Sequence, residues 1–391
     1  MIESAFSYLA ILTIIASSIV YIEKKSQHKL FAYLPAIVII YFIVMLLSTF
    51  GLWQETEAIT ATYKAVKSNL LPAMIFLMLL SADMRQIAKL GKKMILTFFM
   101  AALSIAFGFI ITFALFHTMF EPDAWKSFAA LSGSWMGGTA NMLAIQSALD
   151  VPDSKMGYAL LIDSIDYAIW VMILLALVPM AKKFNTWSGA DTSLIDEVGE
   201  KLAIKELERK DISFHSLFFL IGSALFVSAI SAWLASYLPT TSFLSTTTWI
   251  VIIATIAGII MAMTPLAKIA GSMELGNIML YLIVALIASR ANFAELTQAP
   301  LYIVAGFVII TIHVAFMLVF AKLFKLDLFS LGIASLANIG GVASAPILAS
   351  AYSKALIPIG VLMAMLGYII GTFGGLMVGR VLEFILTQIM Q

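Results

Sequence analysis

The sequence predicts an all-α protein that crosses a membrane many times and is built from two related halves. Three observations support this prediction. The chain is 62% hydrophobic and only 12% charged, apolar runs of membrane-spanning length recur along it, and one Gly-Gly motif occurs twice. Lipid rather than water must therefore be the solvent for most of its surface.

The composition excludes an ordinary soluble domain, because so few charged residues cannot cover the surface of such an apolar chain. Runs such as 33–50 and 217–235 are apolar on every face, whereas the strands of a membrane β-barrel alternate over about 10 residues. The chain has no Cys, which excludes disulfides, thiolate metal sites and thiol catalysis. Its net charge of +1 favours neither a nucleic acid nor a strongly acidic partner.

Hydropathy places two sets of apolar segments on either side of a charged stretch. They cover 5–21, 30–50, 69–82, 94–117, 128–149 and 156–180, and then 213–238, 247–264, 275–289, 301–324, 329–352 and 355–387. Residues 1–180 and 213–391 are therefore predicted to be two membrane repeats, joined by a cytoplasmic linker at 181–212. Apolar residues recur at helical spacing from Leu194 to Leu207, which predicts an amphipathic helix in this linker.

The repeated motif lies in the fifth segment of each half and reads S-x4-G-G-x-A-x6-S-A. Its first copy starts at Ser132 and its second at Ser335, and the two align without gaps. Close packing alone also selects small residues in membrane helices. The equal position of the motif in each half favours a duplicated protein instead, which is how many transporters are built.

Charge in the loops indicates how the halves are oriented. The loop 83–93 is basic and is predicted to be cytoplasmic, so the N-terminus is outside. If each fifth segment re-enters without crossing, acidic Glu121 and Asp123 fall outside, and Lys322 and Lys325 fall inside. Full crossing of both segments would place these lysines outside, against the positive-inside rule. The sequence thus predicts two inverted repeats, each with five crossing helices and one re-entrant Gly-Gly segment.

Both Gly-Gly segments are poor continuous helices, because glycines and hydroxyl-bearing residues weaken helical backbone pairing. A break in mid-membrane frees backbone N–H and C=O groups, which become a ligand site where protein or water satisfies them. The N-terminus of a half-helix favours an anionic group, and C-terminal carbonyls favour a cation. Two tightly packed Gly-rich helices are the alternative. The candidate substrate-binding residues are Ser132, Ser134, Gly137, Gly138, Thr139, Asn141, Ser335, Asn338, Gly340, Gly341 and Ser344.

Asp163 and Asp166 lie three residues apart within an apolar run, on one face of the predicted helix. Carboxylates at this depth are costly and usually functional, so they are the candidate metal or proton site for Na⁺ or H⁺ coupling. Asp166 is slightly favoured because it lies deeper in the segment. A purely structural aspartate that accepts hydrogen bonds from neighbouring helices is the alternative.

Two other polar residues have two interpretations each. Arg290 ends the ninth segment and either pairs with a carboxylate or extends to the membrane surface. His313 lies within an apolar segment and is either a proton relay or a packed, hydrogen-bonded residue.

An enzyme is not expected, because the chain has no H-E-x-x-H, G-x-S-x-G or P-loop motif. An intramembrane aspartyl protease needs carboxylates from different helices, whereas Asp163 and Asp166 share one. A channel stays open as an alternative, since broken helices also line pores.

The Gly-Gly segments, S-G-S-W-M-G-G-T-A-N and S-L-A-N-I-G-G-V-A-S, together with the aspartate-bearing helix, resemble the uncharacterised bacterial YjcL-like membrane family. That family looks related to the bile acid, arsenite and riboflavin transporter superfamily and to sodium/glutamate symporters. The resemblance implies a dimeric elevator-type carrier, with a scaffold and a mobile core that holds the broken segments. The symporters' G-G-H-G-T motif is matched only by Gly137, Gly138 and Thr139, which leaves amino-acid specificity open.

The expected function is secondary active transport of a small polar or anionic organic solute, such as an amino acid, peptide fragment or carboxylate, with Na⁺ or H⁺ as coupling ion. No cofactor and no nucleic-acid partner is expected. The expected setting is the bilayer of a bacterial inner membrane, as a multi-pass homodimer. A channel or a non-transporting membrane protein is the alternative.

Overall fold

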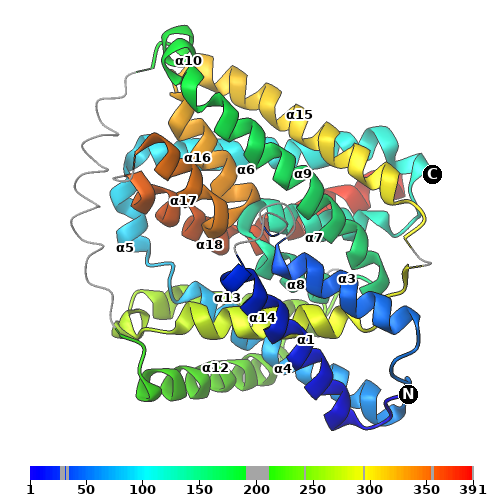
Figure 1. Cartoon of the computed structure of the whole chain (residues 1–391). Helices are drawn as coiled ribbons and strands as arrows, with labels where there is room; N and C mark the ends of the chain where they lie inside the picture. Colours follow the sequence, from blue (N-terminus) through cyan, green and yellow to red (C-terminus); the bar gives the residue numbers. More distant parts are fainter. Residues whose placement is uncertain are drawn as a thin grey trace.

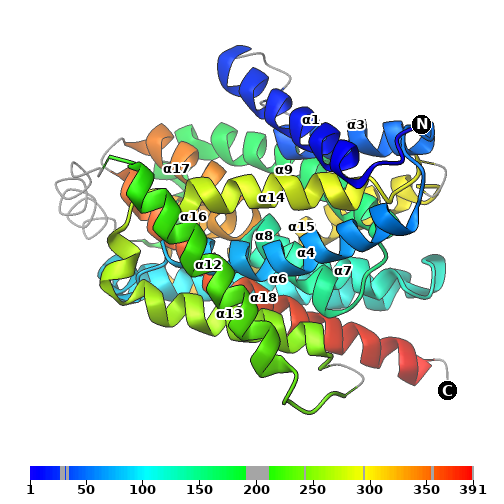
Figure 2. The same ribbon diagram turned by 90° about the horizontal axis from the view of Figure 1, so that it is seen from below.

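The computed structural model describes residues 1–26, 31, 35–190, 211–241, 244–293, 296–353 and 356–389. Within these ranges the chain is all-α apart from a single bridge between Ile2 and Trp53. The helices pack most closely within two groups, which lie one above the other in Figure 1 and are seen from below in Figure 2.

The first group, here called the α4 group, is built around α4, which packs against α12, α13 and α14. Its members are α1 (Ala5–Ser26), α3 (Ala36–Thr49), α4 (Glu57–Leu79), α12 (Phe214–Ala235), α13 (Thr246–Ala262) and α14 (Ser272–Ala288).

The second group, here called the α6 group, is held together by close packing of α18 on α7 and of α15 on α6. Its members are α6 (Gly91–Phe116), α7 (Ala124–Gly137), α8 (Thr139–Ala148), α9 (Met156–Leu177), α15 (Ala299–Phe324), α16 (Leu328–Ile339), α17 (Gly341–Tyr352) and α18 (Ile357–Ile389). Two short helices, α5 (Met84–Ile87) and α10 (Ala181–Ser188), flank this group.

Six helical stretches of the described chain are long and apolar enough to cross a bilayer, so this is a multi-pass membrane protein. They are Ala5–Ser26, Met84–Met119, Asp153–Ser188, Phe214–Ala235, Ala299–Phe324 and Ile357–Gln388. Shorter apolar helices, including α3, α13, α14 and α16, lie among them. The total of ten crossings stays a prediction.

Helix α4 differs most from the hydropathy reading, because it begins at Glu57 rather than near residue 69. Its first turns carry Lys64 and Lys67, which lower the local hydropathy and hide the helix from that measure. Thr56 marks the start, since its side chain accepts a hydrogen bond from the N–H of Ile59 at 3.2 Å. The amphipathic helix predicted for 194–207 lies outside the described residues.

Each Gly-Gly segment is a helical hairpin. In the first, α7 ends at Gly137 and α8 starts at Thr139, with Gly138 at a φ of +89° between them. Gly133 of α7 packs against Ile145 of α8. In two collinear helices these residues would lie far apart, so α7 and α8 fold back on each other. In the second, Gly341 has a φ of +59°. Both turns therefore use a backbone conformation that glycine adopts freely.

The two hairpins approach from opposite ends of α6. The first hairpin starts near the C-terminal end of α6, where Phe128 packs against Phe113 with ring centroids 5.9 Å apart. The second starts near the N-terminal end, where the Ser330 hydroxyl lies 3.2 Å from the sulfur of Met94. The tips of the hairpins consequently meet between the ends of the α6 group.

Candidate functional site

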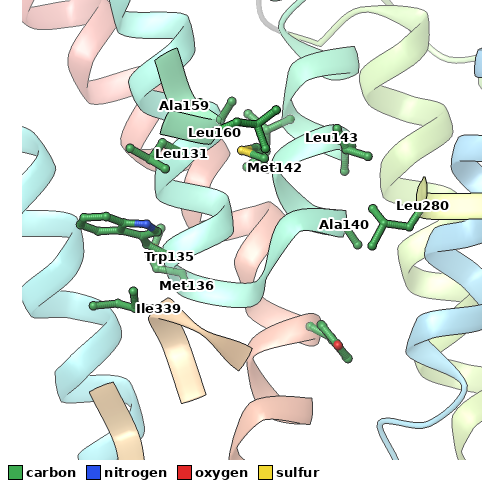
Figure 3. Packing of buried hydrophobic residues seen from close by; sticks show 14 of the residues in the cluster. Leu131, Trp135, Met136, Ala140, Met142, Leu143, Ala159, Leu160, Leu280 and Ile339 are labelled. Carbon is green, nitrogen blue, oxygen red and sulfur yellow. The ribbon is translucent and has the colours of Figure 1, made fainter. Parts of the chain in front are cut away.

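The tips of both hairpins line one cavity of about 210 Å³, which the α4 group closes from the other side. Figure 3 shows this region, with Trp135 and Met136 near the first tip, Ile339 of α16 beside it, and Ala140 facing Leu280 of α14. The polar residues that line the cavity are Ser134, Thr139, Asp163, Ser164, Tyr167, Asn277, Tyr281 and Tyr368.

Two half-helices begin at this cavity. Thr139 and Ala140, the first residues of α8, and Gly341 and Val342, the first of α17, all line it. No side chain caps either start among the described residues. The first N–H groups of a helix have no partner within it and carry part of the helix dipole. Two such ends in one cavity create a favourable environment for an anionic or strongly polar group.

A carboxylate lies in the same cavity. Asp163 of α9 is half-buried and accepts hydrogen bonds from the Ser134 hydroxyl, at 3.2 Å to each oxygen, and from the Trp135 indole N–H at 3.1 Å. Both donors belong to the last turn of α7, so this aspartate is tied directly to the tip of the first hairpin. Its oxygens and the Ser134 hydroxyl are hard ligands of the type that alkali cations prefer.

Asp166 faces a different helix. It is fully buried against Gly306 of α15, and among the described residues neither of its carboxylate oxygens has a hydrogen-bond partner. Spacing along α9 placed the two aspartates on one face, but their surroundings differ. Only Asp163 reaches the cavity.

Of the remaining candidate residues in the first hairpin, some line the cavity and others pack against neighbouring helices or bond to the backbone. Gly138 and Thr139 line the cavity. Gly137 instead packs on Gly371 of α18. The Ser132 hydroxyl donates to the Ala129 carbonyl at 2.7 Å, away from the cavity. Asn141 is buried, where it donates to the Gly137 carbonyl at 2.6 Å.

The second hairpin divides in the same way. Gly340 and Gly341 line the cavity. Ser344 is buried behind them, next to Gly340. Asn338 donates to the Phe98 carbonyl of α6 at 3.3 Å, which fixes α16 in place. The Ser335 hydroxyl lies 2.9 Å from the Trp170 indole nitrogen and belongs to another cluster.

Sequence reasoning missed the aromatic and amide side chains of the cavity. Tyr167 lies one turn after Asp163 on α9, and Tyr368 comes from α18. Asn277 and Tyr281 come from α14, on the side of the α4 group. A lone asparagine in an apolar helix was a signal available in the sequence, whereas the tyrosines resemble ordinary packing residues.

The two polar residues with open interpretations lie outside the cavity. Arg290 forms an ion pair with Glu55 at 3.2 Å and lies over the Tyr63 ring, rather than beside Asp163 or Asp166. His313 is buried and has one ring nitrogen 2.6 Å from the Ser104 hydroxyl and the other 2.8 Å from the Ser335 hydroxyl. These contacts are those of a packed, hydrogen-bonded histidine.

No group of three or more His, Cys, Asp or Glu side chains that could hold a metal ion occurs in the described ranges. The described lining of the cavity offers one carboxylate, that of Asp163, together with hydroxyls, the Asn277 amide and backbone groups.

Comparison with known proteins gives a family without an assigned function. A family model described as "Protein of unknown function (DUF819)" matches residues 10–385. The uncharacterized membrane protein YjcL of Bacillus subtilis (strain 168) is 26% identical over 331 residues, which cover 81% of this chain and 83% of that protein. The resemblance to the YjcL-like family is therefore confirmed over most of the chain.

Proposed function

This chain belongs to the DUF819 family of proteins of unknown function, and from the geometry of its cavity we propose that it is a secondary active transporter. Its cargo is a small polar or anionic organic solute, such as an amino acid, peptide fragment or carboxylate, and its coupling ion is Na⁺ or H⁺. The main observation that supports this proposal is that both hairpin tips and Asp163 line one cavity between the α4 and α6 groups.

The chemistry of the cavity supports this class of substrate. The starts of α8 and α17 favour a carboxylate or another acceptor-rich group. Asn277 and the hydroxyls of Thr139 and Tyr281 supply directional hydrogen bonds. A bound cation on Asp163 would offset the charge that this carboxylate otherwise presents to an anionic solute. Binding of the cation and the solute is thereby linked, which is the requirement for coupled transport.

We assign the coupling role to Asp163. Asp166 was slightly favoured by depth in the sequence, but it faces Gly306 of α15 and has no hydrogen-bonding neighbour among the described residues that would ligate an ion. Asp163 combines exposure to the cavity with two donors from the first hairpin tip. A change in its ionisation is therefore transmitted to the hairpin that lines the substrate cavity.

An elevator mechanism fits the division into two helix groups. In this proposal the α4 group is the scaffold, and the α6 group is the mobile core that carries the hairpins. The inverted duplication is supported by the glycine turns at aligned positions, Gly138 and Gly341, and by the opposite directions of the hairpins. The homodimer and the location in a bacterial inner membrane complete the proposal.

The ion pair between Lys67 and Asp153 offers a test of core movement. Lys67 of α4 donates to Asp153 at 2.9 Å, and Asp153 lies in the connection between α8 and α9. Movement of the core against the scaffold has to break this contact. In the natively Cys-free chain, a cross-linked Lys67→Cys and Asp153→Cys pair is expected to stop uptake, with recovery after reduction. Uptake that continues at the same rate in the cross-linked protein would rule out this movement.

Function is tested directly by solute screening and reconstitution. Thermal shift with candidate amino acids and carboxylates, each in Na⁺ and K⁺ and at two pH values, identifies a ligand and its ion. Uptake of that ligand into proteoliposomes should exceed equilibrium only under an imposed gradient of the coupling ion, and an ionophore should abolish it. A channel would instead equilibrate the solute without accumulation.

Two neighbouring serines provide a matched pair of variants. The Ser134 hydroxyl contacts Asp163, whereas the Ser132 hydroxyl bonds to the backbone of its own helix. Ser134→Ala should raise the cation concentration needed for half-maximal uptake, and Ser132→Ala should leave it unchanged. Equal behaviour of the two variants would remove the Asp163 cluster from the ion site.

A further inference from the structure

A second and larger cavity lies on the other side of α9, away from the hairpin tips. It has a volume of about 450 Å³, which is within the range of ligand pockets. Its walls come from α9, α15 and α16, and Lys183, Phe184 and Trp187 of α10 line one end. Figure 1 shows α10 near the ends of α15 and α16. The walls are apolar and include Leu174, Leu177, Val314, Met317 and Leu331.

Away from the α10 end, the described polar residues of this cavity, Trp170, His313 and Ser335, use their hydrogen-bonding groups on one another and on Ser104. The Trp170 indole nitrogen lies 2.9 Å from the Ser335 hydroxyl, and the two nitrogens of His313 contact Ser335 and Ser104 at 2.8 and 2.6 Å. Because these groups bond to one another, they present ring faces and aliphatic carbon to the cavity. The interior therefore suits a hydrocarbon chain rather than a polar solute.

The end of the cavity at α10 is basic. Lys183 lines it, Lys322 donates to the Trp187 carbonyl at 2.6 Å, and Lys325 lies beside Gly189. Trp187 also lines this end and is 46% exposed, as is typical of tryptophans at a membrane interface. The nearest described carboxylate along the chain, Asp327, is fully buried and bonds to Ser330. The rim is therefore a site for negative charge.

From this combination we infer that the cavity binds one acyl chain of an anionic phospholipid, with its phosphate at Lys183 and its hydrocarbon between α9, α15 and α16. Outward-facing apolar residues beside the cavity, such as Leu318 and Met180, are 42% and 48% exposed, so the bound lipid is continuous with the bilayer. Basic pockets between membrane helices on the cytoplasmic side bind anionic head groups in this way. This lipid site is separate from the proposed transport cavity, and the inference does not depend on the proposed transport function.

Quenching of Trp170 fluorescence tests occupancy, because this residue is only 7% exposed and is shielded from bulk lipid. The full-length protein is reconstituted in vesicles that contain phosphatidylglycerol or phosphatidylcholine with brominated acyl chains. The component of quenching that disappears in Trp170→Phe reports on the cavity. It should saturate at a lower mole fraction of phosphatidylglycerol than of phosphatidylcholine. If this component is absent with both lipids, no lipid occupies the cavity and the proposal is overturned. The same result is expected if residues of the chain itself fill the cavity.

Two variants separate the head group from the acyl chain. Lys183→Gln should weaken phosphatidylglycerol binding about fivefold, the usual effect of one lysine near a membrane surface. Val314→Trp should obstruct the path of the acyl chain, so that for both lipids its quenching equals that of the double variant Val314→Trp with Trp170→Phe. Lys126→Gln, a lysine on α7 that lies over the Trp125 ring, is the matched control and should change nothing.

Native mass spectrometry of phosphatidylglycerol adducts gives a second readout that does not depend on Trp170. Retention of melting temperature by each variant shows that it is folded. Unchanged phosphatidylglycerol binding in folded Lys183→Gln, or in folded Val314→Trp, would overturn the assigned position of the lipid.

Discussion

Helices α9 and α18 each follow one hairpin, yet they contribute to the site in opposite ways. α9 brings polar side chains to the cavity, namely Asp163, Ser164 and Tyr167. α18 brings mainly the absence of side chains, because Gly367 and Gly371 lie directly against the turn of α7 at Gly137. The two helices that follow the hairpins thus contribute in different ways. One supplies charge, and the other supplies close backbone contact that holds the hairpin tip in place.

The largest expected effect comes from the charge on α9. Asp163→Asn should remove cation-dependent stabilisation, which at a hundredfold excess of ion over its Kd amounts to about 2.7 kcal/mol. It should also abolish uptake driven by the ion gradient. Thermal shift in Na⁺, in K⁺ and across pH measures the first effect, and proteoliposome uptake the second.

Asp166→Asn is the matched control for this change, since Asp166 does not reach the cavity. It should shift stability alike in every salt while the ion dependence survives. The opposite pattern, with ion dependence lost only in the Asp166 variant, would transfer the coupling role to that residue.

The close contact of α18 is expected to give the next largest effect. A Cβ at Gly371 would lie 2.7 Å from the Gly137 Cα and 2.8 Å from the Asn141 side chain. Gly371→Ala should therefore destabilise the protein by about 1–3 kcal/mol, the usual cost of overpacking. Unfolding in detergent, followed by tryptophan fluorescence, measures this loss.

Gly374→Ala, on the same helix, provides the comparison. Its Cβ would meet only the sulfur and methyl carbon of Met136, both at 3.1 Å, and this flexible side chain can shift. The helix preference of alanine over glycine offsets the contact. If Gly374→Ala proved as damaging as Gly371→Ala, close backbone approach would not be the reason for the glycines of α18.

The two hairpin turns should differ in their tolerance of a side chain. Gly138 has a φ of +89° and a ψ of +170°, a region that is essentially restricted to glycine, so Gly138→Ala should cost about 1–3 kcal/mol. Gly341 has a φ of +59° and open space around its Cβ position, so Gly341→Ala should cost about 1–2 kcal/mol and Gly341→Asn less. Thermal unfolding of the three variants ranks them. A larger loss at Gly341 would show that contacts rather than backbone conformation control the turns.

Larger side chains at these turns should obstruct the cavity with little effect on membrane insertion. Gly138→Val and Gly341→Val are therefore expected to abolish uptake even where folded protein remains. Normal uptake by both would mean that the hairpin tips do not bind the substrate.

The smallest effect is expected from single Cys substitutions, which test on which side of the membrane the start of each hairpin lies. A Cys at Thr186, which is exposed on α10, should resist an impermeant thiol reagent in intact cells, and a Cys at Asp123 should react. Thr186 suits the experiment better than Ser188, whose side chain is 2% exposed. Labelling at Thr186 without permeabilisation would reverse the predicted topology.

The sequence was sufficient to predict an all-α membrane protein, because membrane-spanning helices are recognisable by their hydropathy. The positions of α6, α9, α12 and α15 agree with the predicted segments within a few residues. The first half of α4 was missed because Lys64 and Lys67 lower its local hydropathy. The number of crossings and the linker helix remain predictions.

The site was only partly predictable. Glycine pairs located both hairpin turns, since few other residues adopt a positive φ freely. Spacing could not separate Asp163 from Asp166, because they lie on one face of α9 but meet different neighbours. Asn277 and Tyr281 reach the cavity only through the packing of α14, which no local pattern records.

The hydrogen bond between the Thr372 hydroxyl and the Asn141 side chain, at 2.6 Å, joins residues that are 231 positions apart. α7 and α8 have 14 and 10 residues, or about 21 and 15 Å at 1.5 Å per residue, so neither arm spans a bilayer of about 30 Å. During synthesis the first hairpin is therefore made more than 200 residues before α18, the helix that packs its turn and satisfies its buried amide. A chain truncated before α18 would therefore carry the first hairpin without the Thr372 hydroxyl and the glycine face that pack its turn.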